Sequence, residues 1–418
     1  MRIRSRAARK GDAANRLGAY PRRVPRPRID DLAYLAGLLL GLLMMTAYGH
    51  FAYRAEVIGV NDFSYVWAGA RTVVDGGDPY DPAPFLATAA RYGTAHPNEP
   101  VYGYPPWVAL ALTPLAALPV ARASDIWTFG GMALAALALR SLLRAYAPGL
   151  PAVHTLAGLA LFGSQPGISA MWSGQWSFVL VAGLSASIVA LPRRGVLGQL
   201  PTLALLGKPH LVLFDVWALV RAAFARRGLA FAAAFVGMLA VTVAVPWLVF
   251  PDWLQAWITK LIPARYALIP PTTMANALYD LFGNAGAYLG ALLLFAAVAI
   301  ALAFDPRSDA ALAVWSALSA TFAPYGWSYD HLLLIVPLVL TAGIVTRRSI
   351  RAGLAVAIVG FVFFLLVPAL LYIIATIRER ESFNAFVPFV VLALAITALW
   401  TSRRASPIGG SVAAEARA

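Results

Sequence analysis

The amino-acid sequence of 418 residues contains no cysteine, three lysines and few charged side chains of either sign. The lack of cysteine excludes disulfides, iron–sulfur clusters and thiolate metal sites. Charged residues make up 12% of the chain, whereas roughly a quarter of a soluble globular protein is charged. Hydrophobic residues make up 60%. These proportions exclude an ordinary soluble domain and predict an all-α polytopic membrane protein.

The positive charge is concentrated near the N-terminus. The formal net charge is +14, and ten basic residues precede the first apolar run, against Asp12 alone until Asp30 and Asp31 at its edge. Basic segments next to a membrane span stay in the cytoplasm. We therefore interpret residues 1–31 as a basic, disordered cytoplasmic segment and 404–418 as a cytoplasmic tail. This distribution also excludes nucleic acid as a partner.

Apolar runs long enough to cross a bilayer core, which takes about 20 helical residues, recur along the chain. The first, 32–53, is longer than a signal-peptide core and has no cleavage site, so we expect it to be retained. With arginine clusters as cytoplasmic markers, further spans are predicted at 124–144, 151–171, 175–192, 195–207, 209–225, 228–250, 285–304, 309–324, 330–346, 351–377 and 383–401. Twelve spans place both termini in the cytoplasm. Proline interrupts the short run 107–118, which we interpret as partly inserted or re-entrant; if it spans, 195–207 does not.

In this topology the polar stretches fall on the outer side of the membrane. The two longest are a first outer loop at 54–104 and a second at 251–283. The inner connections are short and rich in arginine. Function is therefore expected on the outer side.

The first outer loop opens with a segment, 61–70, in which Phe63, Trp67 and Ala70 recur at helical spacing. This spacing predicts a short amphipathic helix on the membrane surface. Asp62 stands at its N-terminus, where aspartate is a favoured capping residue. Capping and chemistry are therefore competing interpretations of Asp62.

Three further aspartates, Asp75, Asp78 and Asp81, lie in a segment rich in glycine and proline. Such a composition is typical of turns, in which aspartate hydrogen-bonds the nearby backbone. We expect these residues to form turns, with a calcium site as the alternative.

Five short segments follow one another along the chain: 62–65 (Asp-Phe-Ser-Tyr), 77–80 (Gly-Asp-Pro-Tyr), 104–106 (Tyr-Pro-Pro), 173–176 (Ser-Gly-Gln-Trp) and 207–210 (Gly-Lys-Pro-His). Their order resembles glycosyltransferase family 87, which includes the mycobacterial polyprenol-phosphate-mannose-dependent mannosyltransferases. The resemblance extends from about residue 32 to the last spans. No single segment is diagnostic, but their order and spacing together are fairly specific.

The resemblance implies a GT-C-like bundle of about 12 transmembrane helices over residues 32–403, in a bacterial plasma membrane, with its active site on the extracytoplasmic face. It implies a donor sugar, mannose or another hexose, linked to polyprenyl phosphate, and a lipid or glycan acceptor. It also implies that Asp62 is the catalytic base. One carboxylate suits a single displacement; a double displacement would need a second carboxylate close by.

Outer-side cations are the candidates for binding the donor phosphate. We assign this role to Lys208, His210, His331 and Arg265, with Asp330 as a possible partner of His331. Snorkelling is the alternative for Lys208, and a structural role is the alternative for His331. Contacts to the sugar or acceptor are expected from Gln175, Trp176, Tyr65 and Tyr104, with packing as the alternative for Trp176.

The sequence lacks the phosphate-binding glycine loop, the HExxH zinc motif and the Asp-x-Asp metal pattern. No metal site is assigned and no cofactor is required, although a divalent cation is compatible with a phosphate donor. The rival functions are a lipid or glycan flippase and a non-catalytic assembly subunit. A flippase would place charges inside the membrane, where the sequence offers mainly Asp215.

Overall fold

The computed structural model describes residues 27–52, 61–94, 99–266, 272–378 and 381–404, and this part of the chain is helical without strands. Its longest helices are α1 (Pro27–Ala52), α6 (Val120–Tyr146), α10 (Pro209–Arg227), α11 (Leu229–Val249), α15 (Asn284–Leu302), α18 (Ile350–Arg378) and α19 (Phe386–Arg404). Intermediate helices are α2 (Asp62–Val74), α3 (Pro82–Arg91), α7 (Pro151–Gly163), α9 (Ser177–Ala190), α14 (Met274–Phe282), α16 (Asp309–Thr321) and α17 (Ile335–Thr346). The short ones are α4 (Pro106–Ala111), α5 (Thr113–Ala116), α8 (Gln165–Trp172), α12 (Trp253–Ala256) and α13 (Ile262–Tyr266). Three 3₁₀ segments, η4 (Val196–Gly207), η6 (Ser328–Leu334) and η7 (Ser382–Ala385), and a π-helical turn, η5 (Trp257–Leu261), complete the described part.

Seven helical segments of the described part are long and apolar enough to cross a membrane. They are Ile29–Gly49, Val120–Tyr146, Leu229–Val249, Asn284–Leu302, Ser328–Thr346, Ile350–Ile377 and Ser382–Thr401. Each coincides with one of the twelve predicted spans. The protein is therefore a membrane protein, as its composition indicates.

The other five predicted spans are short, bent or more polar. The run 151–171 is divided at Ser164, which caps α8 by accepting a hydrogen bond from the backbone N–H of Gly167. The helices α8 and α9 form a pair bent by 118°, which makes an eighth span if the pair is counted as one. The elements η4, α7 and α16 have 12 or 13 residues each, and α10 carries four charged side chains. The run 107–118 forms the two short helices α4 and α5, which do not make a continuous span.

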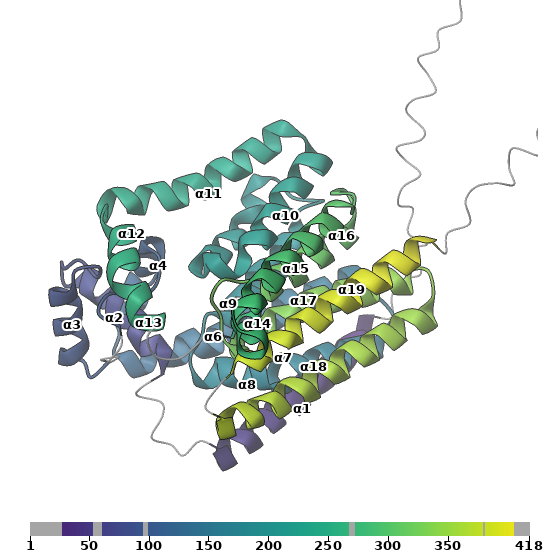
Figure 1. Ribbon diagram of the computed structural model, residues 1–418, viewed down its shortest axis with the longest axis horizontal. Coiled ribbons are helices and arrows are strands. Elements are labelled where there is room, and N and C mark those ends of the chain that lie inside the picture. The colour runs from purple at the N-terminus through teal and green to yellow at the C-terminus, as the bar shows by residue number, and fades with distance from the viewer. Residues whose placement is uncertain (1–26, 53–60, 95–98, 267–271, 379–380, 405–418) are drawn as a thin grey trace, which may run out of the picture.

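The span formed by η6 and α17 is the centre of the bundle. Of its apolar window, 83% is buried, compared with 17–50% for the other six spans. The helices α16, α18 and α19 pack against it. Figure 1 shows α18 and α19 along one side of the molecule, whereas α2, α3, α4 and α12 lie on the opposite side.

The first helix is packed tightly against α7. A Cβ atom on Gly37 would lie 2.2 Å from the carbonyl oxygen of Thr155, and one on Gly158 would lie 2.7 Å from that of Tyr34. Gly37 and Gly41 form a small-x-x-x-small pattern, which allows membrane helices to approach closely. The helix begins at Pro27, before the predicted start of the span at residue 32, and residues 1–26 and 405–418 lie outside the described part.

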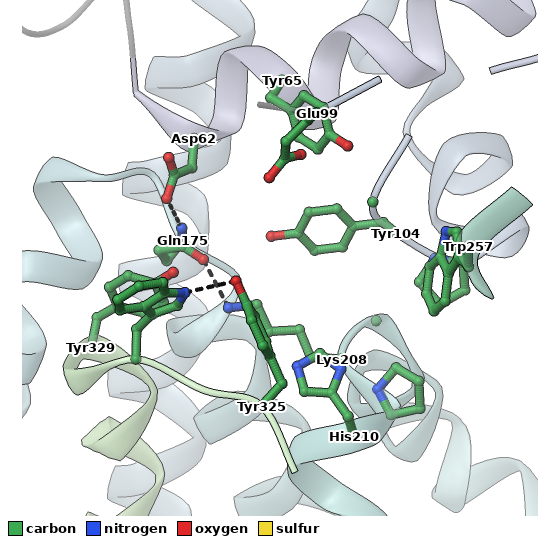
Figure 2. A pocket seen from close by; sticks show the side chains of 15 residues that line it. Asp62, Tyr65, Glu99, Tyr104, Gln175, Lys208, His210, Trp257, Tyr325 and Tyr329 are labelled. Atoms are coloured by element: carbon green, nitrogen blue, oxygen red, sulfur yellow. Dashed lines mark hydrogen bonds between the residues drawn. The ribbon is translucent and has the colours of Figure 1, made fainter. Parts of the chain in front are cut away.

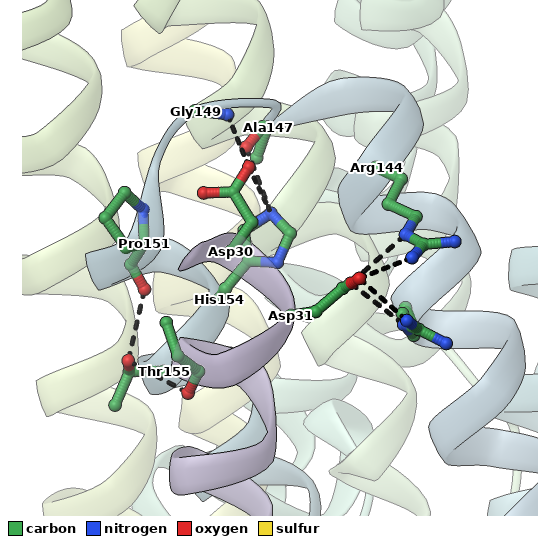
Figure 3. A network of polar contacts seen from close by, with 10 residues as sticks. Asp30, Asp31, Arg144, Ala147, Gly149, Pro151, His154 and Thr155 are labelled. Atoms are coloured by element: carbon green, nitrogen blue, oxygen red, sulfur yellow. Dashed lines mark hydrogen bonds and ion pairs between the residues drawn. The ribbon is translucent and has the colours of Figure 1, made fainter. Parts of the chain in front are cut away.

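The N-terminal turn of α1 is held by the C-terminal end of α6 (Figure 3). Asp31 accepts hydrogen bonds from Arg140 Nε at 2.9 Å and from Arg144 Nη2 at 2.5 Å. Arg347, at the end of α17, lies over the ring of Tyr146, the last residue of α6. We call this end of the bundle the arginine end.

Next to Asp31, the side chain of Asp30 holds the loop between α6 and α7. Its Oδ2 atom accepts a hydrogen bond of 2.7 Å from the backbone N–H of Gly149, whose φ of +75° favours glycine. His154 lies behind it, fully buried, with Nε2 3.1 Å from the carbonyl oxygen of Ala147 (Figure 3). These contacts connect α1 to α7 through the loop as well as through their glycines.

Candidate active site

A cavity of about 390 Å³ lies at the other end of the bundle, where α2 meets the starts of α9 and α10 (Figure 2). This volume is within the range of small-molecule sites, about 300–1,000 Å³. We call this the cavity end. The cavity is lined by Asp62, Tyr65, Glu99, Gly103, Tyr104, Pro105, Gln175, Gly207, Lys208, Pro209, His210, Trp257, Tyr325, Trp327 and Tyr329.

Asp62 reaches the cavity because its neighbour caps the helix. The N-cap of α2 is Asn61, whose side-chain oxygen accepts a hydrogen bond from the backbone N–H of Ser64. Asn61 also donates to Ser124 Oγ at 3.1 Å, which attaches the start of α2 to the start of α6. Asp62 is the first residue of the helix, so the capping interpretation of Asp62 is wrong. Nine of the thirteen residues of α2 are buried, which makes it an enclosed helix rather than an amphipathic surface helix.

The turn between α8 and α9 positions Gln175. Gly174 has a φ of +62°, a backbone conformation that residues other than glycine rarely adopt. A Cβ atom there would lie 2.8 Å from Cβ of Phe63. The turn therefore packs directly on α2. Its carbonyl oxygen at Gly174 accepts a hydrogen bond from the indole of Trp127, which stacks on Phe63.

The junction between η4 and α10 positions Lys208. A Cβ on Gly207 would lie 2.2 Å from the ring of Trp176, so a glycine is needed for the close approach. Trp176 donates from Nε1 to the carbonyl oxygen of Ala204 at 2.8 Å. The Ser-Gly-Gln-Trp and Gly-Lys-Pro-His segments thus fit together, and both direct a polar side chain into the same cavity.

These polar side chains form a continuous chain of hydrogen bonds (Figure 2). The amide Nε2 of Gln175 donates to Oδ2 of Asp62. Lys208 Nζ donates to Oε1 of Gln175 at 2.8 Å and to Oδ1 of Asp330 at 2.8 Å. The ring of Tyr329 lies under the ammonium, 4.8 Å from Nζ to the ring centroid. Both charges of the ion pair are buried, with Lys208 6% and Asp330 5% exposed.

Residues 99–104, at the end of the predicted first outer loop, follow the cavity wall and are held by three side chains. Tyr65 donates from its hydroxyl to the carbonyl oxygen of Val101 at 2.6 Å, and Trp257 donates to that of Tyr102 at 2.9 Å. Tyr80 donates to the carbonyl oxygen of Tyr104 at 2.6 Å. Burial raises the pKa of Tyr80, which keeps this donor proton in place.

The aspartates within and directly after the Gly-Asp-Pro-Tyr segment hydrogen-bond the local backbone. Asp78 Oδ1 accepts a hydrogen bond from the backbone N–H of Tyr80 at 2.8 Å, and Asp81 caps α3. The prediction that these two form turns is confirmed. Asp75 lies in the turn that ends α2, as predicted, and its side chain also pairs with Arg71, four residues earlier.

The sequence profile of glycosyltransferase family 87 matches residues 102–324, which is more than half of the chain. The chain belongs to this family. It is therefore a membrane glycosyltransferase. No curated protein and no solved structure matches the sequence.

The matched region of the family 87 chain contains the two segments that meet at the cavity, residues 173–176 and 207–210. Asp62 and Asp330 lie outside it and are joined to these segments by the hydrogen bonds described above. The cavity therefore combines side chains from within and from outside the family match.

Six of the nine predicted site residues line the cavity: Asp62, Tyr65, Tyr104, Gln175, Lys208 and His210. Trp176 and His331 do not. Trp176 is buried against Trp127, with ring centroids 4.7 Å apart, which corresponds to the packing alternative. His331 is 4% exposed and faces a smaller cavity behind Asp330. The side chain of Arg265, in α13, lies outside the described residues.

Asp330 does not have the role that its position next to His331 suggests. It accepts hydrogen bonds from Lys208, from Ser177 Oγ at 3.2 Å and from the backbone N–H of Trp327 at 3.1 Å. Adjacent residues of a 3₁₀ segment point in different directions, so sequence proximity is a poor guide to this pairing.

Several residues of this glycosyltransferase's cavity were missed by the sequence prediction. Glu99 adds a second carboxylate, Trp257 comes from the predicted second outer loop, and Tyr325 and Tyr329 flank Lys208 and His210. All four lie in stretches that the topology places outside the membrane, which was the available signal. Among the described residues, no three His, Asp or Glu side chains gather as metal ligands would.

Proposed function

We propose that this membrane glycosyltransferase transfers a hexose, with mannose favoured, from a polyprenyl-phosphate-linked donor to a lipid or glycan acceptor. The observation that carries the proposal is the position of Asp62, which lines the cavity and receives the amide of Gln175. A general base must lie within reach of the hydroxyl that it deprotonates. A carboxylate at a cavity wall, held by a neutral donor, meets that requirement.

In the proposed reaction Asp62 accepts the proton of the acceptor hydroxyl as its oxygen attacks the anomeric carbon. The bond between that carbon and the phosphate oxygen breaks, and polyprenyl phosphate leaves with the electron pair. A single displacement of this kind inverts the anomeric configuration. Glu99 shares the cavity, so the stereochemistry of the product also tests whether a second carboxylate takes part.

The donor phosphate is proposed to lie between His210 and Lys208. His210 is partly exposed and lines the cavity next to the ring of Tyr325, 5.7 Å away. Lys208 contributes positive charge to the same wall, although Asp330 balances it. Preorganised positive charge stabilises a leaving phosphate more effectively than water does. Tyr104 and Gln175 would contact the sugar or acceptor.

The proposed orientation places the cavity end outside the cell and the arginine end in the cytoplasm of a bacterium. Two arginines on α6, Arg140 and Arg144, and Arg347, directly after α17, mark the arginine end. The positive-inside rule supports this orientation. The polyprenyl tail would then remain in the bilayer while its phosphate reaches the cavity.

The test is incubation of the purified full-length protein, in lipid vesicles, with a panel of polyprenyl-phosphate hexoses and candidate acceptors. Mass spectrometry should detect release of polyprenyl phosphate and a matching gain of one hexose on an acceptor. A folded protein that cleaves no donor in the panel would contradict the proposal. Movement of the donor across the bilayer without cleavage would favour the flippase instead.

A further inference from the structure

The donors and acceptors around Gln175 fix the direction in which its amide points. An ammonium group has N–H donors and no acceptor, so the side chain of Lys208 must face the carbonyl oxygen of Gln175. The NH₂ group of Gln175 then faces Asp62, as in the structure. Reversal of the amide would place two donors against each other at Lys208.

The ammonium of Lys208 is itself held by three contacts within the described part of the chain. One N–H reaches Gln175, another reaches Asp330, and the ring of Tyr329 lies beneath. Asp330 is fixed in turn by Ser177 and by the backbone N–H of Trp327. A buried ion pair is a weak source of stability, because desolvation offsets the attraction between the charges. Its position suggests a different role.

We propose that Lys208 and Asp330 are positioning residues that hold the amide of Gln175 with its NH₂ group toward Asp62. A hydrogen bond donated to a carboxylate favours its charged form. A hydrogen bond that the protonated carboxyl group itself donates, as it would to a reversed amide oxygen, favours the neutral form. The ion pair therefore keeps Asp62 deprotonated and ready to act. The consequence for catalysis rests on the proposed function, but the orientation of the amide does not.

The inference gives Lys208 a positioning contact to Gln175 in addition to its proposed place beside the donor phosphate. Other groups of the cavity also affect the charge of Asp62, and their contribution has to be held constant in any test. These groups are Glu99 on the returning loop, Tyr65 on α2, Tyr104 before α4, His210 on α10, and Tyr325 and Tyr329 near η6. None of them is changed in the variants below.

The test compares the wild type with the double variant Lys208→Met and Asp330→Asn. The two substitutions together keep the net charge, and the new amide at position 330 retains an oxygen for Ser177 and Trp327, so folding should persist. Infrared difference spectra, taken against an Asp62→Asn partner in each background, report protonation of Asp62 without any substrate. We expect its titration midpoint to rise by about one pH unit, a tenfold change in proton affinity.

A third variant separates an effect through Gln175 from a direct effect of charge. Gln175→Leu alone should raise the titration midpoint of Asp62. In the triple variant, which combines Gln175→Leu with the double variant, the midpoint should rise by less than the sum of the two separate rises. An unchanged midpoint in the double variant overturns the inference, and so do two strictly additive rises. The matched control is Arg226→Met with Asp309→Asn, which removes an ion pair of 3.0 Å at the arginine end and should leave the midpoint unchanged.

Transfer activity gives the second readout. In the double variant the acidic limb of the profile of kcat/KM against pH should move up by about one pH unit. The value of kcat/KM should therefore fall about tenfold at pH values below the wild-type midpoint and recover as the pH is raised, since Asp62 then ionises again. A rate that falls equally at all pH values indicates a structural role and contradicts the inference. If the wild type transfers no sugar, the proposed function fails, while the infrared titration still decides the inference about Gln175.

Discussion

Helix α6 carries a polar network at each end, and the two networks differ in construction. At its start, Ser124 binds Asn61 beside the cavity; at its end, Arg140 and Arg144 bind Asp31. Along the helix Ser124 and Arg144 are about 30 Å apart at the usual helical rise. At the arginine end the side chains of the pairs with Asp31 are 23–49% exposed, whereas Lys208 and Asp330 are almost completely buried.

The difference indicates two purposes. Partly exposed ion pairs contribute little to stability, about 0–1 kcal/mol each, but they attach one helix to another and mark one side of the membrane. A buried chain of polar groups is costly unless every member is paired, and this one ends at a cavity. We therefore expect changes at the cavity end to affect the rate and changes at the arginine end to affect stability.

The largest effect is expected from Asp62→Asn. Loss of a general base costs about 10²–10⁴-fold in rate, so transfer should fall by that factor. The thermal midpoint in detergent should stay near that of the wild type, because Asn61 caps α2. Asp31→Asn is the matched control at the other end of the molecule.

Asp31→Asn should leave the transfer rate within about twofold and lower the free energy of unfolding by about 1 kcal/mol or less. Both quantities come from the same preparations, by donor-release assay and thermal unfolding. If Asp62→Asn retained full activity, or Asp31→Asn lost it, the division between the two ends would be incorrect.

The sequence predicts the long spans and the position of Asp62 because both depend on local properties. Hydropathy identifies seven spans that the structure contains, and the first outer loop is defined by its distance from the first of them. The five remaining spans are mostly short or bent segments enclosed by other helices. Irregular backbone is tolerated at membrane depth only where protein or a water-filled cavity surrounds it, and hydropathy does not detect such surroundings.

The connections within the site could not be predicted in the same way. Gln175 lies 113 residues from Asp62, and Lys208 lies 122 residues from Asp330. Which side chains meet depends on the packing of α2, α9, α10 and η6 together. Nothing in the local sequence distinguishes Asp330 as a partner of Lys208 from Asp330 as a partner of His331.

Gly207→Ala is expected to have an intermediate effect and to lower both the transfer rate and the stability. The added methyl group would meet Trp176 at 2.2 Å, so the ring or the start of α10 must shift. Overpacking typically costs about 1–3 kcal/mol. Because Lys208 follows directly, we also expect about a tenfold loss of transfer rate. A variant with unchanged unfolding and unchanged rate would show that the close approach at Gly207 does not position Lys208.

Asp30→Asn removes the charge of a side chain at the arginine end but keeps its hydrogen-bond acceptor. The amide oxygen can still accept from Gly149, but the hydrogen bond loses its charge. Charged hydrogen bonds contribute about 1 kcal/mol more than neutral ones, so the free energy of unfolding should fall by that amount. Chemical or thermal unfolding measures the change, with the donor-release rate expected to be unaltered. A loss of transfer with normal stability would indicate that the loop between α6 and α7 influences the distant cavity.

Asp78→Asn should have the smallest effect, and its sign depends on pH. Burial, opposed by the Tyr80 N–H, raises the pKa of Asp78 above its ordinary value of 3.8, so the folded state binds this proton more tightly than the unfolded state. Stability therefore falls as the pH rises from 3.8 through the raised pKa, and the full cost is present above it. The amide oxygen of the variant still accepts the Tyr80 N–H without that cost. The variant should unfold about 1–2 °C higher than the wild type at neutral pH and show no advantage below pH 3.8. A variant that unfolds at a lower temperature than the wild type at neutral pH would mean that the charge of Asp78 stabilises the turn supporting Tyr80 and Tyr104.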